Sequence, residues 1–218
     1  MKINHHPADE LLLGYAAGAT SEAFSLVIAT HLALCPTCRC VVAQAESVGG
    51  AMLESATPVP LNPGALDSVL SRLDEPAPPP PDDPAKSTSK NAAGVPEPLR
   101  SYVGGDFDAV PWTKITQDIA FKLVMKTGDM RAHLVRSKAG HGVGTHAHRG
   151  EELTLVLTGG YTDVTGRYAA GDVQYTTPEI VHRPLADEGG DCIALVVSDG
   201  SLKFRSFLER LGGWWFGF

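Results

Sequence analysis

The stretch His31-Leu-Ala-Leu-Cys35-Pro-Thr-Cys38 decides the fold of the first part of this chain. On a helix, His31 and Cys35 are one turn apart and share a face, and Cys35-Pro-Thr-Cys38 can direct two thiolates at one ion. Three such ligands suit Zn²⁺, which binds four in a tetrahedron, and His5-His6 offers the fourth. The spacing therefore predicts a structural zinc site. The alternative is a helix that carries reduced cysteines and a buried histidine.

The residues around this motif predict a small helical domain. Apolar residues recur at helical spacing in four stretches, and His31 and Cys35 fall on the apolar face of the second. So small a domain rarely builds a sufficient core, and a bound metal can supply folding free energy. The fourth stretch packs on its own domain or, as the alternative, on a partner. The predicted helices start near Asp9, at Ser21-Glu22 and at Pro36, the third ends at Gly49-Gly50, and the fourth spans about residues 63 to 75.

The composition restricts where the chain acts and what it binds. Its 218 residues carry a net charge of −7 and contain no run of the ~20 apolar residues that a bilayer span needs. The N-terminus lacks the apolar core of a signal peptide, and three of the four cysteines crowd into residues 35 to 40, so we expect a reducing, cytoplasmic location without a membrane. Residues 1 to 75 hold three Lys or Arg against eight Asp or Glu, which argues against direct binding of nucleic acid.

A proline-rich segment divides the chain. Eight of its sixteen prolines lie between residues 76 and 98, among Asp, Lys, Ser and Thr residues that cannot form a core. We therefore expect two domains, residues 1–75 and 99–218, joined by a linker of residues 76–98.

Beyond the linker, apolar residues alternate with a period of two, which is typical of β-strands. Turns such as Thr127-Gly128-Asp129 and Val164-Thr165-Gly166 separate the alternating stretches. Short strands at this spacing favour a sandwich or barrel of the jelly-roll type. The predicted strands are residues 119–125, 130–135, 152–157, 171–175 and 192–197.

A second group of candidate metal ligands lies in this all-β half. His146 and His148 are two residues apart, so on a strand both side chains point to one face. Arg149-Gly150 allows a tight turn that returns Glu152 beside them, and His182 follows about 30 residues later. Three imidazoles and a carboxylate that point into a barrel predict a site for Zn²⁺, Mn²⁺, Fe²⁺ or Ni²⁺.

The second half resembles the cupins. It departs from their second motif at Ile180, where a glycine is usual, and in a proline–histidine spacing that is one residue short. The first cupin motif is matched at Gly140, His146, His148, Glu152 and Gly159, and the second at Gly171, Pro178 and His182.

The first half resembles the zinc-binding anti-sigma domain. The His…His-x3-Cys-x2-Cys signature of that domain is matched by His6, His31, Cys35 and Cys38, and this match favours His6 over His5 as the first ligand. With both modules in this order, nearly the whole chain outside the linker resembles the ChrR-type anti-sigma factors of photo-oxidative stress responses. The resemblance implies an α+β fold, in which a small all-α zinc-binding helical domain precedes an all-β cupin domain, a jelly-roll barrel.

The resemblance also implies a regulator of transcription. The helical domain would bind and inhibit an extracytoplasmic-function (ECF) sigma factor in a 1:1 complex, and the cupin, with Zn²⁺ or another divalent metal, would sense singlet oxygen or derived peroxides. The alternative is a metal-dependent cupin enzyme, a dioxygenase or isomerase, with a zinc-stabilised interaction domain. That alternative leaves the helical domain and linker without a role, so we expect no enzyme.

Three further features have simpler interpretations. Cys40 is predicted to be an ordinary helix residue, because Cys35-x-x-Cys38 is the better chelate. Cys192 is predicted to be a buried thiol, with a redox role as the alternative. The aromatic C-terminus, from Phe204 to Phe218, is expected to pack on the barrel, or instead to cover the N-terminal domain or a dimer interface.

Overall fold

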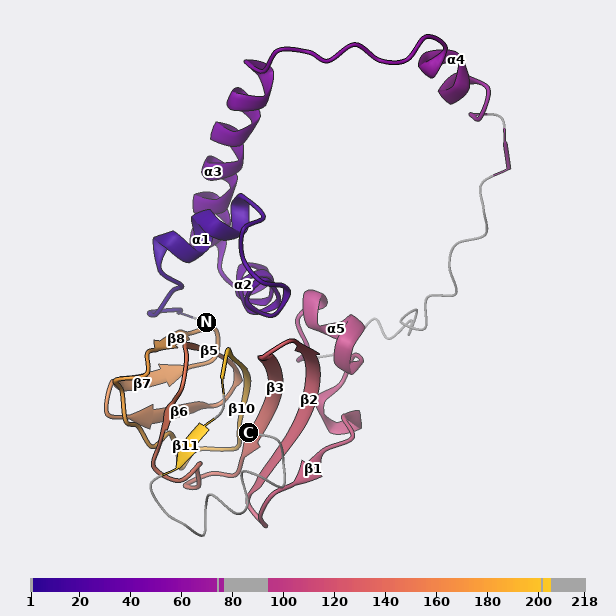
Figure 1. Cartoon of the computed structure of the whole chain (residues 1–218). Helices are drawn as coiled ribbons and strands as arrows, with labels where there is room; N and C mark the ends of the chain where they lie inside the picture. The colour runs from indigo at the N-terminus through magenta and orange to yellow at the C-terminus, as the bar shows by residue number, and fades with distance from the viewer. Residues whose placement is uncertain (1, 74, 77–93, 201, 205–218) are drawn as a thin grey trace.

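The computed structural model describes residues 2–73, 75–76, 94–200 and 202–204. The helices are α1 (Asp9–Ala16), α2 (Glu22–Leu34), α3 (Pro36–Glu54), α4 (Ala65–Leu70), α5 (Glu97–Val103) and the short 3-10 helix η1 (Phe107–Ala109). The strands are β1 (Thr113–Lys114), β2 (Ile119–Thr127), β3 (Met130–Ser137), β4 (His146–His148), β5 (Glu152–Thr158), β6 (Gly160–Asp163), β7 (Gly166–Ala169), β8 (Val173–Thr176), β9 (Leu185–Ala186), β10 (Cys192–Ser198) and β11 (Leu202–Phe204). Helices α1 to α3 lie over one side of a β-barrel, and α4 lies on an extended arm away from both (Figure 1).

The local sequence sets where the N-terminal helices begin. The hydroxyl of Ser21 accepts a hydrogen bond from the backbone N–H of Phe24 and caps α2. Pro36 occupies the first turn of α3, where its missing N–H costs nothing. The chain bends by 119° between α2 and α3, which places Cys35 at the corner.

Two helices differ in length from the prediction. Helix α3 continues through Gly49-Gly50 to Glu54, because a glycine inside a helix costs only about 1 kcal/mol and does not stop it. Helix α4 is shorter than predicted and ends at Leu70. It begins at Ala65 rather than at residue 63, because Gly64 has a φ of 81°, in the left-handed region.

A six-stranded antiparallel sheet in the order β1-β2-β3-β10-β5-β8 forms the largest layer of the second half. Strands β5 and β10 are buried on both faces, as expected where both sides of a sheet are covered. Leu153, Leu155 and Val197 belong to one hydrophobic core with buried residues of α2, while Thr154 and Val196 line a cavity inside the barrel. The helices therefore cover the outer face of this sheet.

Two smaller sheets complete the barrel. They have the strand orders β7-β6-β9 and β11-β4, and a bridge between His146 and His182 connects the two cupin motifs. The predicted jelly-roll architecture is confirmed, and so is the helical domain before it. Strand β8 begins at Val173 rather than at residue 171, because Gly171 has a φ of 91° and turns the chain.

Some of the predicted segments lie outside the described residues. They include residues 77–93 of the predicted linker and residues 205–218 of the aromatic C-terminus. Shortly after residues 77–93, Val95 is buried, and Leu99 of α5 packs in the core shared with α2. In the part of the chain that the structure describes, no single helix has the length and apolar character to cross a membrane, and only the bent pair α2 and α3 would pass that test together.

Candidate metal centres

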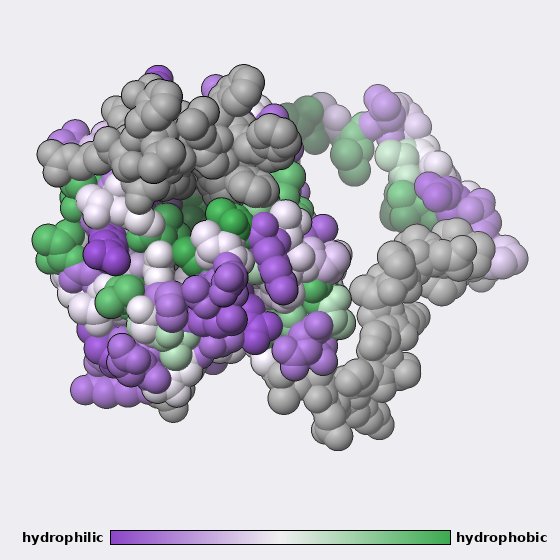
Figure 2. Space-filling model, turned by 90° about the horizontal axis from the view of Figure 1, so that it is seen from below, coloured by the Kyte–Doolittle hydropathy of each residue, from purple (hydrophilic) through white to green (hydrophobic). Residues whose placement is uncertain are grey.

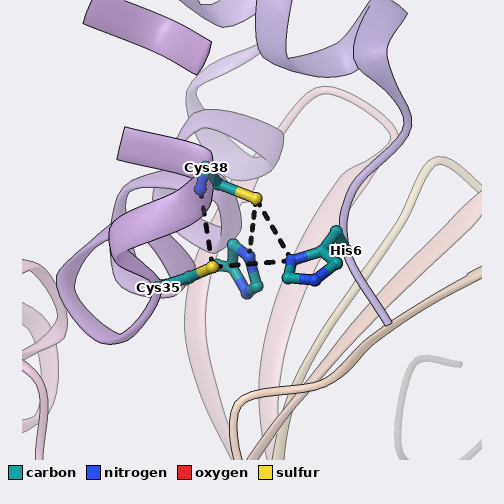
Figure 3. Close-up of side chains that lie close together, drawn as sticks. His6, Cys35 and Cys38 are labelled. Carbon is teal, nitrogen blue, oxygen red and sulfur yellow. Dashed lines mark hydrogen bonds between the residues drawn. The ribbon is translucent and has the colours of Figure 1, made fainter. Parts of the chain in front are cut away.

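The first candidate centre lies where the N-terminal segment meets the corner between α2 and α3. One nitrogen or sulfur atom from each of His6, His31, Cys35 and Cys38 lies within 4.8 Å of the other three. The Nδ1 atom of His6 is 3.5 Å from Cys35 Sγ and 3.3 Å from Cys38 Sγ, and the three side chains point toward one another (Figure 3). His5, the other candidate ligand, lies beside Asp172 instead: its Nδ1 is 3.4 Å from Asp172 Oδ2.

The hydrogen bonds of His31 identify the nitrogen that is free to bind a metal. Its Nδ1 lies 2.9 Å from the backbone carbonyl of Gly171, which can only accept, so Nδ1 carries the proton. The unprotonated Nε2 therefore faces Cys38 Sγ at 3.3 Å. Burial lowers the pKa of His31 to about 4, which keeps the ring neutral, as a metal ligand must be.

The two cysteines form a compact knuckle at this corner. Both thiols are buried, and the backbone N–H of Cys38 donates to Cys35 Sγ at 3.5 Å. Burial, followed by the neighbouring Cys35, raises the pKa of the Cys38 thiol to about 12. A bound cation removes this penalty, because it stabilises the thiolate directly. Two thiols and two imidazoles converging on one point thus fit a tetrahedral metal ion.

The second candidate centre lies inside the barrel. Strand β4 directs His146 and His148 inward, and the bridge to β4 brings His182 beside them. His182 Nε2 is 2.9 Å from His148 Nε2 and 3.0 Å from His146 Nε2, and all three rings are buried. The structure thus brings three of the predicted ligands together from two separate motifs.

The protonation of these rings favours a cation between them. His146 Nδ1 donates to the carbonyl of Gly144 at 2.8 Å, and His182 Nδ1 lies 2.9 Å from the carboxylate of Asp163. The Nε2 atoms of both rings are therefore lone-pair donors, and two lone pairs 3.0 Å apart repel unless positive charge lies between them. Burial lowers the pKa of His146 to about 4, so a metal ion fits that position better than a proton.

Glu152 stands at the edge of this group. Its carboxylate oxygens are 3.4 Å from His148 Nδ1 and 4.0 Å from His182 Nε2, and Thr154 donates to it at 3.3 Å. His148 Nδ1 is buried and makes no hydrogen bond. Burial raises the pKa of Glu152 to about 7, against the opposing effect of His182, so a nearby metal ion would decide whether it ionises.

The barrel centre opens into a cavity of about 600 Å³. His146, Glu152 and His182 line it beside mostly apolar side chains, among them Ile119, Phe121 and Val196. The metal-binding atoms are thus accessible to a small molecule that enters the barrel, whereas the N-terminal cluster supplies four ligands, enough to fill a tetrahedral site.

The residues that orient these ligands were not predicted from the sequence. Burial acts to raise the pKa of Asp163, but hydrogen bonds from His182, Gln174 and Thr165 outweigh it and lower the pKa, so Asp163 is a charged acceptor for His182. In the sequence, Asp163 is recognisable only as a turn residue. Its Oδ1 accepts a hydrogen bond from the backbone N–H of Thr165, as is common for Asp in turns. The acceptors Gly144 and Gly171 act through backbone carbonyls, which a sequence motif does not reveal.

The remaining cysteines and histidines lie outside both clusters. Cys40 is exposed on α3, and Cys192 is a buried thiol whose pKa is raised to about 12 by burial and by Asp187. His133 is buried in β3 beside Phe121, and His141 is an exposed loop residue that pairs with Asp118.

Known proteins similar to this chain combine the same two modules. Residues 101–202 match the family model of the ChrR cupin-like domain. The chain is 42% identical over 211 residues to the anti-sigma-E factor ChrR of Cereibacter sphaeroides, and the match covers 97% of both proteins. The structure is also similar, with a TM-score of 0.77 and 40% identity, to a chain in the crystal structure of Rhodobacter sphaeroides SigE in complex with the anti-sigma ChrR, over 90% of this chain and 99% of that one.

Proposed function

The chain belongs to the ChrR family of anti-sigma factors, and on that premise we propose that it binds and inhibits an ECF sigma factor and releases it under oxidative stress. The observation that carries the proposal is the identity of 42%, which extends over 97% of both this chain and its relative. The role is regulatory rather than enzymatic, and we propose a cytoplasmic location, because a sigma factor acts with RNA polymerase in that compartment.

The exposed apolar residues of the first half support a docking surface for the sigma factor. Near the end of α3, Met52 and Leu53 are exposed, and α4 exposes Leu66, Val69 and Leu70. Green apolar side chains are interspersed with purple polar ones along the arm that carries α4 (Figure 2). Monomeric proteins rarely leave so many large apolar side chains in contact with water without a partner to cover them.

The charge of this half supports the same partner. Residues 1 to 75 hold eight acidic against three basic side chains, and the promoter-binding surfaces of a sigma factor must be basic to meet DNA. Acidic helices complement such a surface and block its access to nucleic acid.

The donor sets support different roles for the two metals. We propose Zn²⁺ at His6, His31, Cys35 and Cys38, because two thiolates and two imidazoles with no open position are typical of structural zinc. At His146, His148, Glu152 and His182 we propose Zn²⁺ or another divalent metal, and the adjoining cavity gives an oxidant derived from singlet oxygen access to it.

Co-purification tests the proposed function directly. The chain is co-expressed with the ECF sigma factor of its source, and the complex is sized and its zinc counted. We expect a 1:1 complex with two metal ions per chain. If the two proteins migrate separately, or if the chain turns over a small phenol or keto acid when loaded with Fe²⁺ or Ni²⁺, the enzyme interpretation gains instead.

A further inference from the structure

One turn of the barrel contacts the N-terminal metal centre. Gly171 and Asp172 connect β7 to β8, and Gly171 has a φ of 91°, which the turn requires. The Gly171 carbonyl accepts the Nδ1–H of His31 at 2.9 Å, across 140 residues of sequence. This bond is buried, and it fixes the tautomer that leaves His31 Nε2 toward the two cysteines.

Asp172 holds the N-terminal segment that carries His6. Its Oδ1 accepts the backbone N–H groups of Asn4 at 2.7 Å and His5 at 2.9 Å, and the N–H of Val173 donates to the His5 carbonyl at 3.0 Å. Its Oδ2 accepts from Ala169 at 2.9 Å and lies 3.4 Å from His5 Nδ1. The carboxylate is buried, so these interactions fix the N-terminal segment one residue before His6.

Strand β8, which begins directly after Asp172, leads to the barrel centre. Gln174, two residues after Asp172, donates from Nε2 to Asp163 Oδ2 at 2.8 Å, and that oxygen lies 2.9 Å from His182 Nδ1. Strand β8 also pairs with β5, where Glu152 lies opposite Thr176. The chain from Asp172 to Gln174, followed by two part-buried hydrogen bonds, therefore joins the turn to a ligand of the second centre.

We propose that the turn Gly171–Asp172 supports the N-terminal metal centre and couples it to the centre in the barrel. Occupancy of His146, His148 and His182 holds Asp163, Gln174 and β8 in place, and β8 in turn holds His31 and the segment before His6. The inference rests on the proposed metal sites, and it makes Asp172 a positioning residue for a centre in the other half of the chain. Such coupling is reciprocal, so a metal at either centre tightens binding at the other.

Cobalt distinguishes the two centres in the full-length protein. Only the N-terminal centre contains thiolates, so sulfur-to-Co²⁺ charge-transfer absorption reports its occupancy alone. We expect Asp172→Asn to weaken Co²⁺ binding there by about tenfold, the lower end of the range for residues that support metal ligands. The matched control is Asp191→Asn, which removes a carboxylate that binds Arg136 and Ala139 but contacts neither centre, and it should leave the affinity unchanged.

A second variant tests the same contact without a substitution in the barrel, so a misfolded barrel cannot account for its effect. Asn4→Pro removes one N–H that donates to Asp172 without altering the barrel, and it should weaken Co²⁺ binding several-fold. If both variants bind Co²⁺ as the natural protein does, the turn does not support the centre.

A double-mutant cycle tests the coupling itself. His148→Ala, which impairs the barrel centre, should weaken Co²⁺ binding at the N-terminal centre by about fivefold or more, and this effect should vanish in the Asp172→Asn background. Equal effects in both backgrounds, or none, would overturn the coupling. These affinities are measured without a sigma factor, so a chain that fails to bind one would refute the proposed function and leave this result standing.

Discussion

His31 is the residue at which the two halves of the molecule meet. One ring nitrogen donates to a carbonyl of the barrel, and the other faces the thiols of the helical half. A neutral imidazole has one donor and one acceptor, and here both are committed. This accounts for a histidine that is completely buried without a charged partner.

Loss of a ligand at the N-terminal centre is expected to abolish inhibition. His31→Ala, Cys35→Ser or Cys38→Ser each removes one of four ligands from a domain whose folding free energy depends on its metal. Zinc content should fall by one ion per chain, and sigma-dependent transcription should rise to the level without the chain. Cys40→Ser is the control, because Cys40 is exposed on α3. Equal damage from Cys40→Ser would mean that the wrong thiol has been assigned.

Loss of a ligand in the barrel is expected to affect the response and not the inhibition. Glu152→Ala leaves the exposed faces of α3 and α4 unchanged, so the sigma factor should remain bound in unstressed cells. The rise in transcription with singlet oxygen should be blunted, because a switch needs a state that the signal stabilises differently. The measurement is reporter transcription with and without singlet oxygen in cells with full-length protein. Constitutively high transcription would show that the barrel centre helps to hold the sigma factor.

His133 is expected to make the fold sensitive to acid. Burial, with a smaller effect of Arg131, lowers its pKa to about 4, so the native state binds fewer protons than the unfolded state between pH 6.5 and 4. Its contribution is therefore present above pH 6.5 and is lost as the pH falls through this window, by about 2 to 3 kcal/mol at pH 4.5.

Urea unfolding at pH 7 and pH 4.5 measures this contribution. His133→Asn should lose less stability on acidification than the natural protein, whereas His141→Asn, in an exposed loop, should behave like the natural protein. An unchanged pH dependence in His133→Asn would assign the acid sensitivity to other groups.

At this scale, spacing predicted the ligands but not their orientation. The i, i+4 spacing of His31 and Cys35 and the two-residue spacing of His146 and His148 follow from helix and strand geometry, and the structure brings each pair together. The choice of His6 over His5 depends on Asp172, a residue more than 160 positions away that binds the backbone before it. No local pattern contains such a contact.

Among the elements, α4 differs from the other helices, because no residue within its bounds is buried. We expect Leu66→Glu or Val69→Glu to weaken sigma binding by at least tenfold, as for a buried apolar contact in an interface. The unfolding midpoint of the free chain should stay the same, because both side chains are exposed. Val164→Glu, at an exposed turn of the barrel, is the matched control in a calorimetric or biosensor titration. Unchanged affinity in both α4 variants would locate the interface elsewhere.

The longest strands were predictable from periodicity, whereas α5 and the short strands β1, β6, β7, β9 and β11 were not predicted. Strands β2, β3, β5 and β10 have long alternating or continuous apolar runs, and they form where the sequence places them. The burial of β5 and β10 on both faces was harder to predict. Leu153 packs toward α2 and Thr154 toward the cavity, and only the placement of α2 on the sheet explains why residues on both faces are buried.

At the scale of the whole molecule, the proposed division of the chain can be tested with a fragment. Residues 1–85 retain the four N-terminal ligands and α4, so we expect the fragment to inhibit the sigma factor. It lacks Gly171 and Asp172, so it should release its metal about tenfold faster to a competing chelator than the full chain does. Transcription in vitro and chelator absorbance measure the two properties. A fragment that folds with zinc and fails to hold the sigma factor would show that the barrel contributes to the interface.

The hydrogen bond between His31 and Gly171 also has a consequence for synthesis on the ribosome. The two residues are 140 positions apart, so the helical half leaves the ribosome before the turn that contains Gly171 has been synthesised. At the usual 5–20 residues per second, this delay lasts roughly 7 to 28 s. During that interval each nascent chain has all four metal ligands but not the carbonyl that orients one of them. We therefore expect the nascent helical half to hold its metal less tightly until the turn of the barrel that contains Gly171 has been translated.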